Sequence, residues 1–185
     1  MILKGTVLIP NIPNTKGNVL DEYRIRKVSL IFNRQVNLID VQHTLQSVGS
    51  ILESYITDDE MQFLGNTYPK GTWFVSVDVT DPEIQDAIRG GEYTDFSILA
   101  APYRSVEEMK RKRSWIDVSL QFKDIKDWKP SSISIVDKPA HLLAIFEVYE
   151  DDNEFIRKYS EKVNIMPESE KQKNINNVTM FESFF

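Results

Sequence analysis

The sequence from Thr72 to Pro102 reads TWFVSVDVTDPEIQDAIRGGEYTDFSILAAP, and its pattern predicts a strand, a helix and a second strand in direct succession. Apolar and polar residues alternate over 72–80, which is typical of a strand with one buried face. Asp81-Pro82-Glu83 has the capping residue, the proline and the acidic residue that favour a helix start, and Gly90-Gly91 ends that helix. The second strand follows with no room for another element.

This second strand, Tyr93–Pro102, places Ser97 among the apolar residues Phe96, Ile98 and Leu99. The ordinary role of such a serine is a hydroxyl bonded to nearby backbone. The chain has only two histidines, however, and His43 lies upstream in the strand-like stretch Val36–His43. A serine hydroxyl is a poor nucleophile unless a base takes its proton, and histidine suits that role. Ser97 and His43 are therefore the candidate nucleophile and base for acyl transfer.

Composition limits the other classes of function. The 185 residues suit one domain, or one domain with a tail, and the 41% apolar share is enough for a core. No apolar run approaches the length of a membrane span, and the first residues lack the layout of a signal peptide. Without cysteine there is no disulfide framework and no thiolate metal site, so we expect neither a metal nor a cofactor.

Charge argues against nucleic acid as a partner. The net charge of −6 disfavours general affinity for phosphates, so no specific nucleic-acid binding is expected. The one basic cluster, Lys110–Arg113, is more often a solvated turn or helix end than a binding patch.

The remaining pattern favours an α+β fold that is mainly β. Leu20–Phe32 has apolar residues at helical spacing, and Ser105–Arg113 is a second, charged helix candidate. Further strands are predicted over residues 1–9, 36–43, 47–56, 60–64, 115–122, 132–136 and 142–149. Many short strands with few parallel crossovers indicate a mostly antiparallel β-barrel flanked by helices.

The composition changes near residue 150, which divides the chain into a barrel domain, 1–150, and a C-terminal extension, 151–185. Glu168–Asn177 is polar and predicts a linker. Val178–Phe185 then turns apolar and aromatic. We expect this last segment to dock, either on its own domain or on a partner.

Six blocks, in order, resemble the prohead proteases of tailed phages, specifically the XkdF-like branch of phage serine proteases. The nucleophile block of that family is G-x-x-T-G-F-S-I, and Gly90–Ile98 is similar to it, with Thr94, Phe96, Ser97 and Ile98 in place. The closing strand, S-L-V-D-K-P-A, is similar to Ser134–Ala140. The other matching blocks are Lys4–Pro10 with Thr15–Asn18, Leu38–Thr44, Glu53–Ile56 and Tyr68–Trp73.

The resemblance implies a barrel related to the herpesvirus maturation proteases and a serine endopeptidase that matures the phage head. Ser97 would attack the scissile carbonyl, and His43 would be the general base. The implied partners are the scaffold and major capsid proteins, with the portal as a further candidate, and a homo-oligomer is expected. The implied location is the host cytoplasm, inside the prohead or virion.

A third residue should orient the histidine. Many relatives have an acid at the start of the closing strand, where this chain has Ser132. Asp137 is the nearest acidic alternative and is our candidate. His141 is a second alternative, although its place beside a Pro-Ala turn indicates a loop or surface residue. Among the carboxylates Asp40 is the runner-up, but three residues before His43 on a strand it should face the opposite side.

The nucleophile block also departs from the family pattern, because Asp95 stands where a glycine is usual. A carboxylate near the nucleophile disfavours the oxyanion formed in catalysis. The alternative hypothesis is therefore a catalytically weak or inactive structural protein of the virion on the same fold, since fold does not fix function. A binding domain unrelated to phages would require all six matches to be accidental.

Overall fold

The computed structural model describes residues 1–102 and 128–165. The predicted helix 105–113, the strand 115–122, the basic cluster and the aromatic end of the chain lie outside these residues. The chain divides into two compact units, Met1–Val148 and Tyr149–Phe185.

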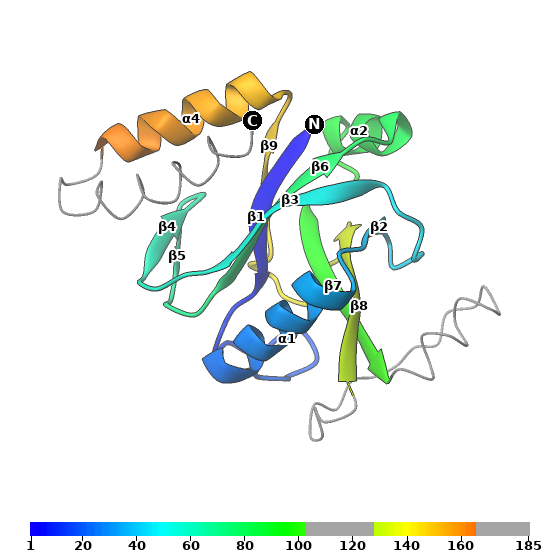
Figure 1. Ribbon diagram of the computed structural model, residues 1–185, viewed down its shortest axis with the longest axis vertical. Helices are drawn as coiled ribbons and strands as arrows, with labels where there is room; N and C mark the ends of the chain where they lie inside the picture. The colour runs from blue at the N-terminus through cyan, green and yellow to red at the C-terminus, as the bar shows by residue number, and fades with distance from the viewer. Residues whose placement is uncertain (103–127, 166–185) are drawn as a thin grey trace. The chain divides into compact units, whose positions relative to one another are not determined.

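The first unit is built on a curled seven-stranded sheet with the order β7-β8-β2-β3-β6-β1-β9 (Figure 1). The strands are β1 (Ile2–Leu8), β2 (Ile39–Val41), β3 (Gly49–Ile56), β6 (Trp73–Val79), β7 (Asp95–Pro102), β8 (Trp128–Val136) and β9 (Phe146–Tyr149). The helices are α1 (Glu22–Gln35) and α2 (Pro82–Arg89), and the second unit has α4 (Asp152–Ile165). Among the described residues the fold is therefore α+β and mainly β, as predicted, with three helices.

Two strands far apart in the sheet order approach each other at the segment Ala144–Phe146. The Phe96 N–H of β7 donates to the Ala144 carbonyl at 2.7 Å, and the Thr6 N–H of β1 donates to the Ile145 carbonyl at 3.2 Å. Because this segment binds β7 on one side and β1 on the other, it holds the sheet in its curled form. The position of β7, the strand that carries Ser97, thus depends on residues that lie 45 or more positions later in the sequence.

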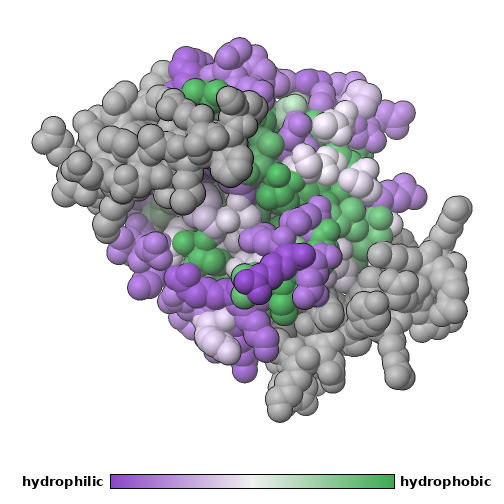
Figure 2. Space-filling view, viewed as in Figure 1, coloured by the Kyte–Doolittle hydropathy of each residue, from purple (hydrophilic) through white to green (hydrophobic). Residues whose placement is uncertain are grey.

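The core follows from the alternation along β6. Trp73, Val75, Val77 and Val79 are fully buried in the main cluster, while Phe74, on the other face, joins a second cluster with Ile9, Phe63 and Tyr68. Both faces of this central strand are therefore covered. Figure 2 shows hydrophilic side chains over much of the described surface in this view, with apolar groups between them.

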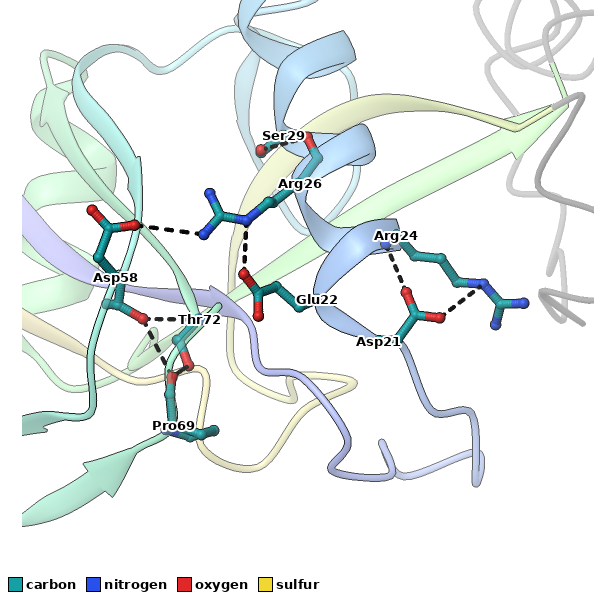
Figure 3. Close-up of polar contacts among 9 residues, drawn as sticks. Asp21, Glu22, Arg24, Arg26, Ser29, Asp58, Pro69 and Thr72 are labelled. Atoms are coloured by element: carbon teal, nitrogen blue, oxygen red, sulfur yellow. Dashed lines mark hydrogen bonds and ion pairs between the residues drawn. The ribbon is translucent and has the colours of Figure 1, made fainter.

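Helix α1 begins at Glu22, two residues after the start of the predicted helix. The Asp21 carboxylate accepts from the Arg24 N–H at 2.8 Å and caps the helix. Arg26 then pairs with Glu22 one turn earlier at 2.9 Å and with Asp58 of the β3–β4 connection at 3.6 Å (Figure 3). These exposed pairs add little stability, but they orient the helix N-terminus beside that connection.

Helix α2 has a comparable cap that gives a direct test. The Asp81 side chain accepts from the Glu83 N–H at 2.9 Å and the Ile84 N–H at 3.3 Å. We expect Asp81→Ala to lower the free energy of unfolding by about 1 kcal/mol in urea titrations. Asp86→Ala, which removes only an exposed pair with Arg89 in the same helix, is the control and should change stability much less. Equal effects would show that the cap stabilises the protein no more than the exposed pair does.

Several predicted boundaries are wrong. No strand was predicted over residues 66–68, yet Asn66–Tyr68 forms β5, which pairs with β4 (Met61–Phe63) as a hairpin. The strand predicted over 142–149 begins only at Phe146, because residues 142–145 form the turn that reaches both β7 and β1. The strand predicted over 36–43 is only Ile39–Val41, which changes where His43 lies.

The sheet is also mixed rather than wholly antiparallel. Strands β2 and β8 are parallel neighbours, with Ile39 opposite Ile133 and Asp40 opposite Ser134. In the described part of the chain, no helix is both long and apolar enough to cross a membrane.

Candidate active site

Three strands place a row of polar residues across one face of the sheet. Ser97 of β7 is directly opposite Ser134 of β8, and Ser134 is opposite Asp40 of β2. The next residues along, such as Phe96 and Ile135, point into the core on the other face. Strand alternation therefore puts Ser97, Ser134 and Asp40 on one face of the sheet. Ser132, two residues from Ser134, lies on the same face.

His43 reaches this row through a turn. The chain leaves β2 after Val41, and Gln42 and His43 have left-handed backbone conformations, with φ of 50° and 59°. The Leu45 N–H donates to Asp40 Oδ2 at 2.7 Å, which closes the turn. Such conformations are unfavourable for residues other than glycine and cluster at functional sites.

The turn places the His43 ring against Ser134. The distance from His43 Nδ1 to Ser134 Oγ is 2.5 Å, and Ser134 Oγ lies 3.4 Å from Ser132 Oγ. Ser97 and His43 do not come from neighbouring strands, because His43 follows β2 and β8 lies between β7 and β2.

Ser97 and His43 nevertheless open onto one cavity of about 550 Å³. Asp137 also lines it, so all three predicted catalytic residues meet at this cavity. The described lining residues are Thr15, Lys16, His43, Ser97, Asp137, Lys138, Pro139, Ala140 and Leu142. Among the described residues no hydrogen bond joins the Ser97 hydroxyl to His43; uncomplexed enzymes often hold such pairs apart until substrate binds.

The Asp137 carboxylate is hydrogen-bonded to Gln42. It accepts from Gln42 Nε2 at 2.8 Å, and this bond is the main reason that its pKa is lowered. The side chain is exposed. Asp137 thus helps to hold the turn beside His43, and its role as orienting acid stays a prediction.

His141 is in a loop, as expected, but it is buried rather than at the surface. Neither ring nitrogen has a hydrogen-bond partner within the described ranges. Burial is the main cause of its lowered pKa. It does not line the cavity of Ser97 and His43.

Asp95, the departure in the nucleophile block, is also buried. Its carboxylate accepts from the Thr94 hydroxyl at 2.5 Å, and burial raises its pKa. It is absent from the cavity lining.

Sequence reasoning missed Ser134 and misplaced Asp40. Ser134 was part of the closing block but had no assigned role. Asp40 was placed on the wrong face because strand alternation was continued to His43, whereas the backbone turns at Gln42. Two non-glycine residues in left-handed conformation leave no signal in the sequence.

The described residues offer no metal site. In residues 1–102 and 128–165 no three acidic or histidine side chains gather as ligands. The chemistry available is that of hydroxyls, one imidazole and nearby charges.

The imidazole of His43 is neutral at ordinary pH. Burial, followed by the charge of Lys16, lowers its pKa to about 4. A neutral ring can accept a proton, which a general base requires, and it stays neutral well below pH 6.

We expect NMR titration of the His43 ring to give a pKa near 4, and Lys16→Ala to raise it only partly, because burial is the larger cause. Since the unfolded chain titrates near 6.5, His43 contributes stability that is present above that pH and is lost as pH falls toward 4. A ring that titrates near 6.5 in the folded protein would contradict its burial.

Comparison with known proteins relates the sequence of this chain to a family. Residues 1–107, more than half of the chain, match the family described as "Putative phage serine protease XkdF". The chain belongs to this family. The matched residues include both His43 and Ser97, while Ser134 lies beyond them.

Two curated relatives from Bacillus subtilis (strain 168) are similar over part of their length. The "Uncharacterized protein YqbD" is 29% identical over 111 residues, which cover 60% of this chain and 34% of that protein. The "Phage-like element PBSX protein XkdF" is 25% identical over 121 residues, 65% of this chain and 44% of that protein. The match thus spans less than half of each relative. No solved structure matches the chain.

Proposed function

We propose that this protein is a serine endopeptidase of phage head maturation, with Ser97 as nucleophile and His43 as general base. The observation that carries the proposal is the single cavity onto which both side chains open, with a neutral imidazole on one wall. Membership of the phage serine protease family supports it.

The proposed reaction follows from these groups. The Ser97 oxygen attacks the scissile carbonyl while its proton passes to His43, and the protonated ring then gives that proton to the leaving amine. Water repeats the sequence to release the acyl group.

Ser134 must be weighed against Ser97 as nucleophile, because its oxygen already contacts the histidine. Ser134 is fully buried, and it does not line the cavity. Ser97 is 5% exposed and does line it. A substrate carbonyl therefore has access to Ser97 and not to Ser134.

We propose scaffold and capsid-protein extensions as the substrates, inside the prohead, with the portal as a further partner. The test is co-expression of the full chain with the scaffold and capsid proteins of its own phage, followed by mass spectrometry. We expect truncated products that disappear with Ser97→Ala. Intact scaffold and capsid proteins in both samples would contradict the proposal.

An inactive virion component is the second candidate. The observation that favours it is the nearly buried Ser97, which makes no hydrogen bond to His43 within the described ranges. On this hypothesis the aromatic end, Val178–Phe185, docks on another virion protein. Deleting 178–185 should then reduce recovery of the protein in assembled heads without changing any cleavage.

A further inference from the structure

The proposed function gives no role to Asp40, the buried carboxyl that closes the turn carrying His43. Asp40 is fully buried, and its Oδ2 accepts from the Leu45 N–H. Its Oδ1 is also buried and has no hydrogen-bond partner in the described part of the chain. A buried carboxylate oxygen without a donor is costly, so its retention calls for a reason.

The hydroxyls of Ser134 and Ser132 in β8 lie on the same face of the sheet as Asp40. Ser134 is the register partner of Asp40, and Ser134 and Ser132 both act on the carboxyl to lower its pKa, against the larger raising effect of burial. Ser134 Oγ is at the same time 2.5 Å from His43 Nδ1. One hydroxyl thus lies between the carboxyl and the ring.

The direction of these hydrogen bonds is fixed by the acid. When Asp40 is ionised its carboxylate can only accept, so a Ser134 hydroxyl that gives its proton to Asp40 must itself accept from the ring. The ring then carries its proton on Nδ1, and Nε2 remains the basic nitrogen. A histidine base needs this tautomer when another group accepts a hydrogen bond from its Nδ1–H, because Nε2 must then take the proton of the nucleophile.

We infer that Asp40 is the orienting acid of this site and acts on His43 through Ser134, in the chain His43 Nδ1–H to Ser134 Oγ–H to Asp40. The inference rests on the proposed function for its catalytic meaning, but the hydrogen-bond chain can be tested without catalysis. Asp40 is a positioning residue here, since it touches neither substrate nor Ser97.

Asp40 has a simpler role that must be separated from this one. Its Oδ2 closes the turn that carries His43, so any change at Asp40 can act through the turn. Ser134→Ala removes the link to the ring and leaves the bond between Asp40 and Leu45. Ser131→Ala is the matched control, because Ser131 is a buried serine of the same strand whose hydroxyl has no hydrogen-bond partner within the described residues.

The first measurement is the tautomer of His43 by NMR of the full chain labelled with ¹⁵N-histidine. The chain has only two histidines, so His43→Gln assigns both rings. We expect the Nδ1–H tautomer in the wild type and after Ser131→Ala. Ser134→Ala and Asp40→Asn should move the ring toward Nε2–H, since an asparagine amide can donate where the carboxylate accepts.

The second measurement is the rate at which an alkyl fluorophosphonate labels Ser97, followed from pH 4 to 8. Labelling forms the bond from Ser97 oxygen to phosphorus, breaks the P–F bond and passes the serine proton to His43. A wrong tautomer in a Ser-His-Asp site costs about 10⁴-fold, and through an intervening hydroxyl we expect at least about tenfold for Ser134→Ala and Asp40→Asn. Lys16, Asp137 and Lys138 also line the cavity with His43, and they are unchanged in both variants.

The outcomes separate the two claims. If the tautomer is as inferred but Ser97 is never labelled, the proposed function fails and the hydrogen-bond chain stands. If Ser97 is labelled as fast in Ser134→Ala as in the wild type, with the tautomer unchanged, the inference fails and the proposed function stands. Should Asp40→Asn not fold, Ser134→Ala decides alone.

Discussion

Replacement of Ser97 by alanine is expected to abolish covalent labelling of the full chain by an alkyl fluorophosphonate. Ser97 lines the cavity and Ser134 does not, so the phosphonyl group should be found on the peptide that contains Ser97. Intact-mass spectrometry should show one adduct in the wild type and none in the variant. The expected loss is at least about 10³-fold in rate, comparable to loss of a nucleophile or base in serine proteases.

His43→Gln should reduce labelling to a similar extent, because the serine proton then has no acceptor. Ser134→Ala is the informative control, since it keeps Ser97 and His43 and should still be labelled at Ser97, although more slowly. An adduct on Ser134, or equal labelling of Ser97→Ala and the wild type, would reject Ser97 as the nucleophile.

The largest effect on stability is expected at Gly5 of β1. A Cβ built at Gly5 would lie 2.3 Å from the Ile145 carbonyl oxygen and 2.7 Å from Phe146 Cα. Both contacts are with backbone, which cannot rotate away as a side chain can. We therefore expect Gly5→Ala to lower the free energy of unfolding by about 3 kcal/mol, at the upper end of the range for overpacking, as measured in urea.

Gly5→Ala should also affect the site. The segment that the methyl group would displace includes Ala144, whose carbonyl accepts from the Phe96 N–H next to Ser97. Labelling of Ser97 should therefore slow even where the variant is folded. Gly90→Ala is the control, because Cβ contacts there begin only at 3.4 Å and the backbone is right-handed. Similar stability for the two variants would contradict the close approach of β1 and this segment.

The identity of the candidate nucleophile and base could be read from the sequence, since both depend on local signals. Ser97 lies in a short strand after the Gly90-Gly91 helix end, and His43 is one of two histidines. The strand β6 and helix α2 were predicted nearly to the residue because alternation, capping and glycine act over a few neighbours.

The surroundings of these two residues depended on tertiary structure. Strand β8 lies between β7 and β2, and Ser134 is therefore opposite both Ser97 and Asp40. These pairings join residues about 40 to 90 positions apart in the sequence. The face on which Asp40 lies relative to His43 was set by the left-handed backbone conformations of Gln42 and His43. Neither residue type predicts such a conformation. Periodicity fixes which side of a strand a residue occupies only while the strand continues, and here the strand ended two residues before the histidine.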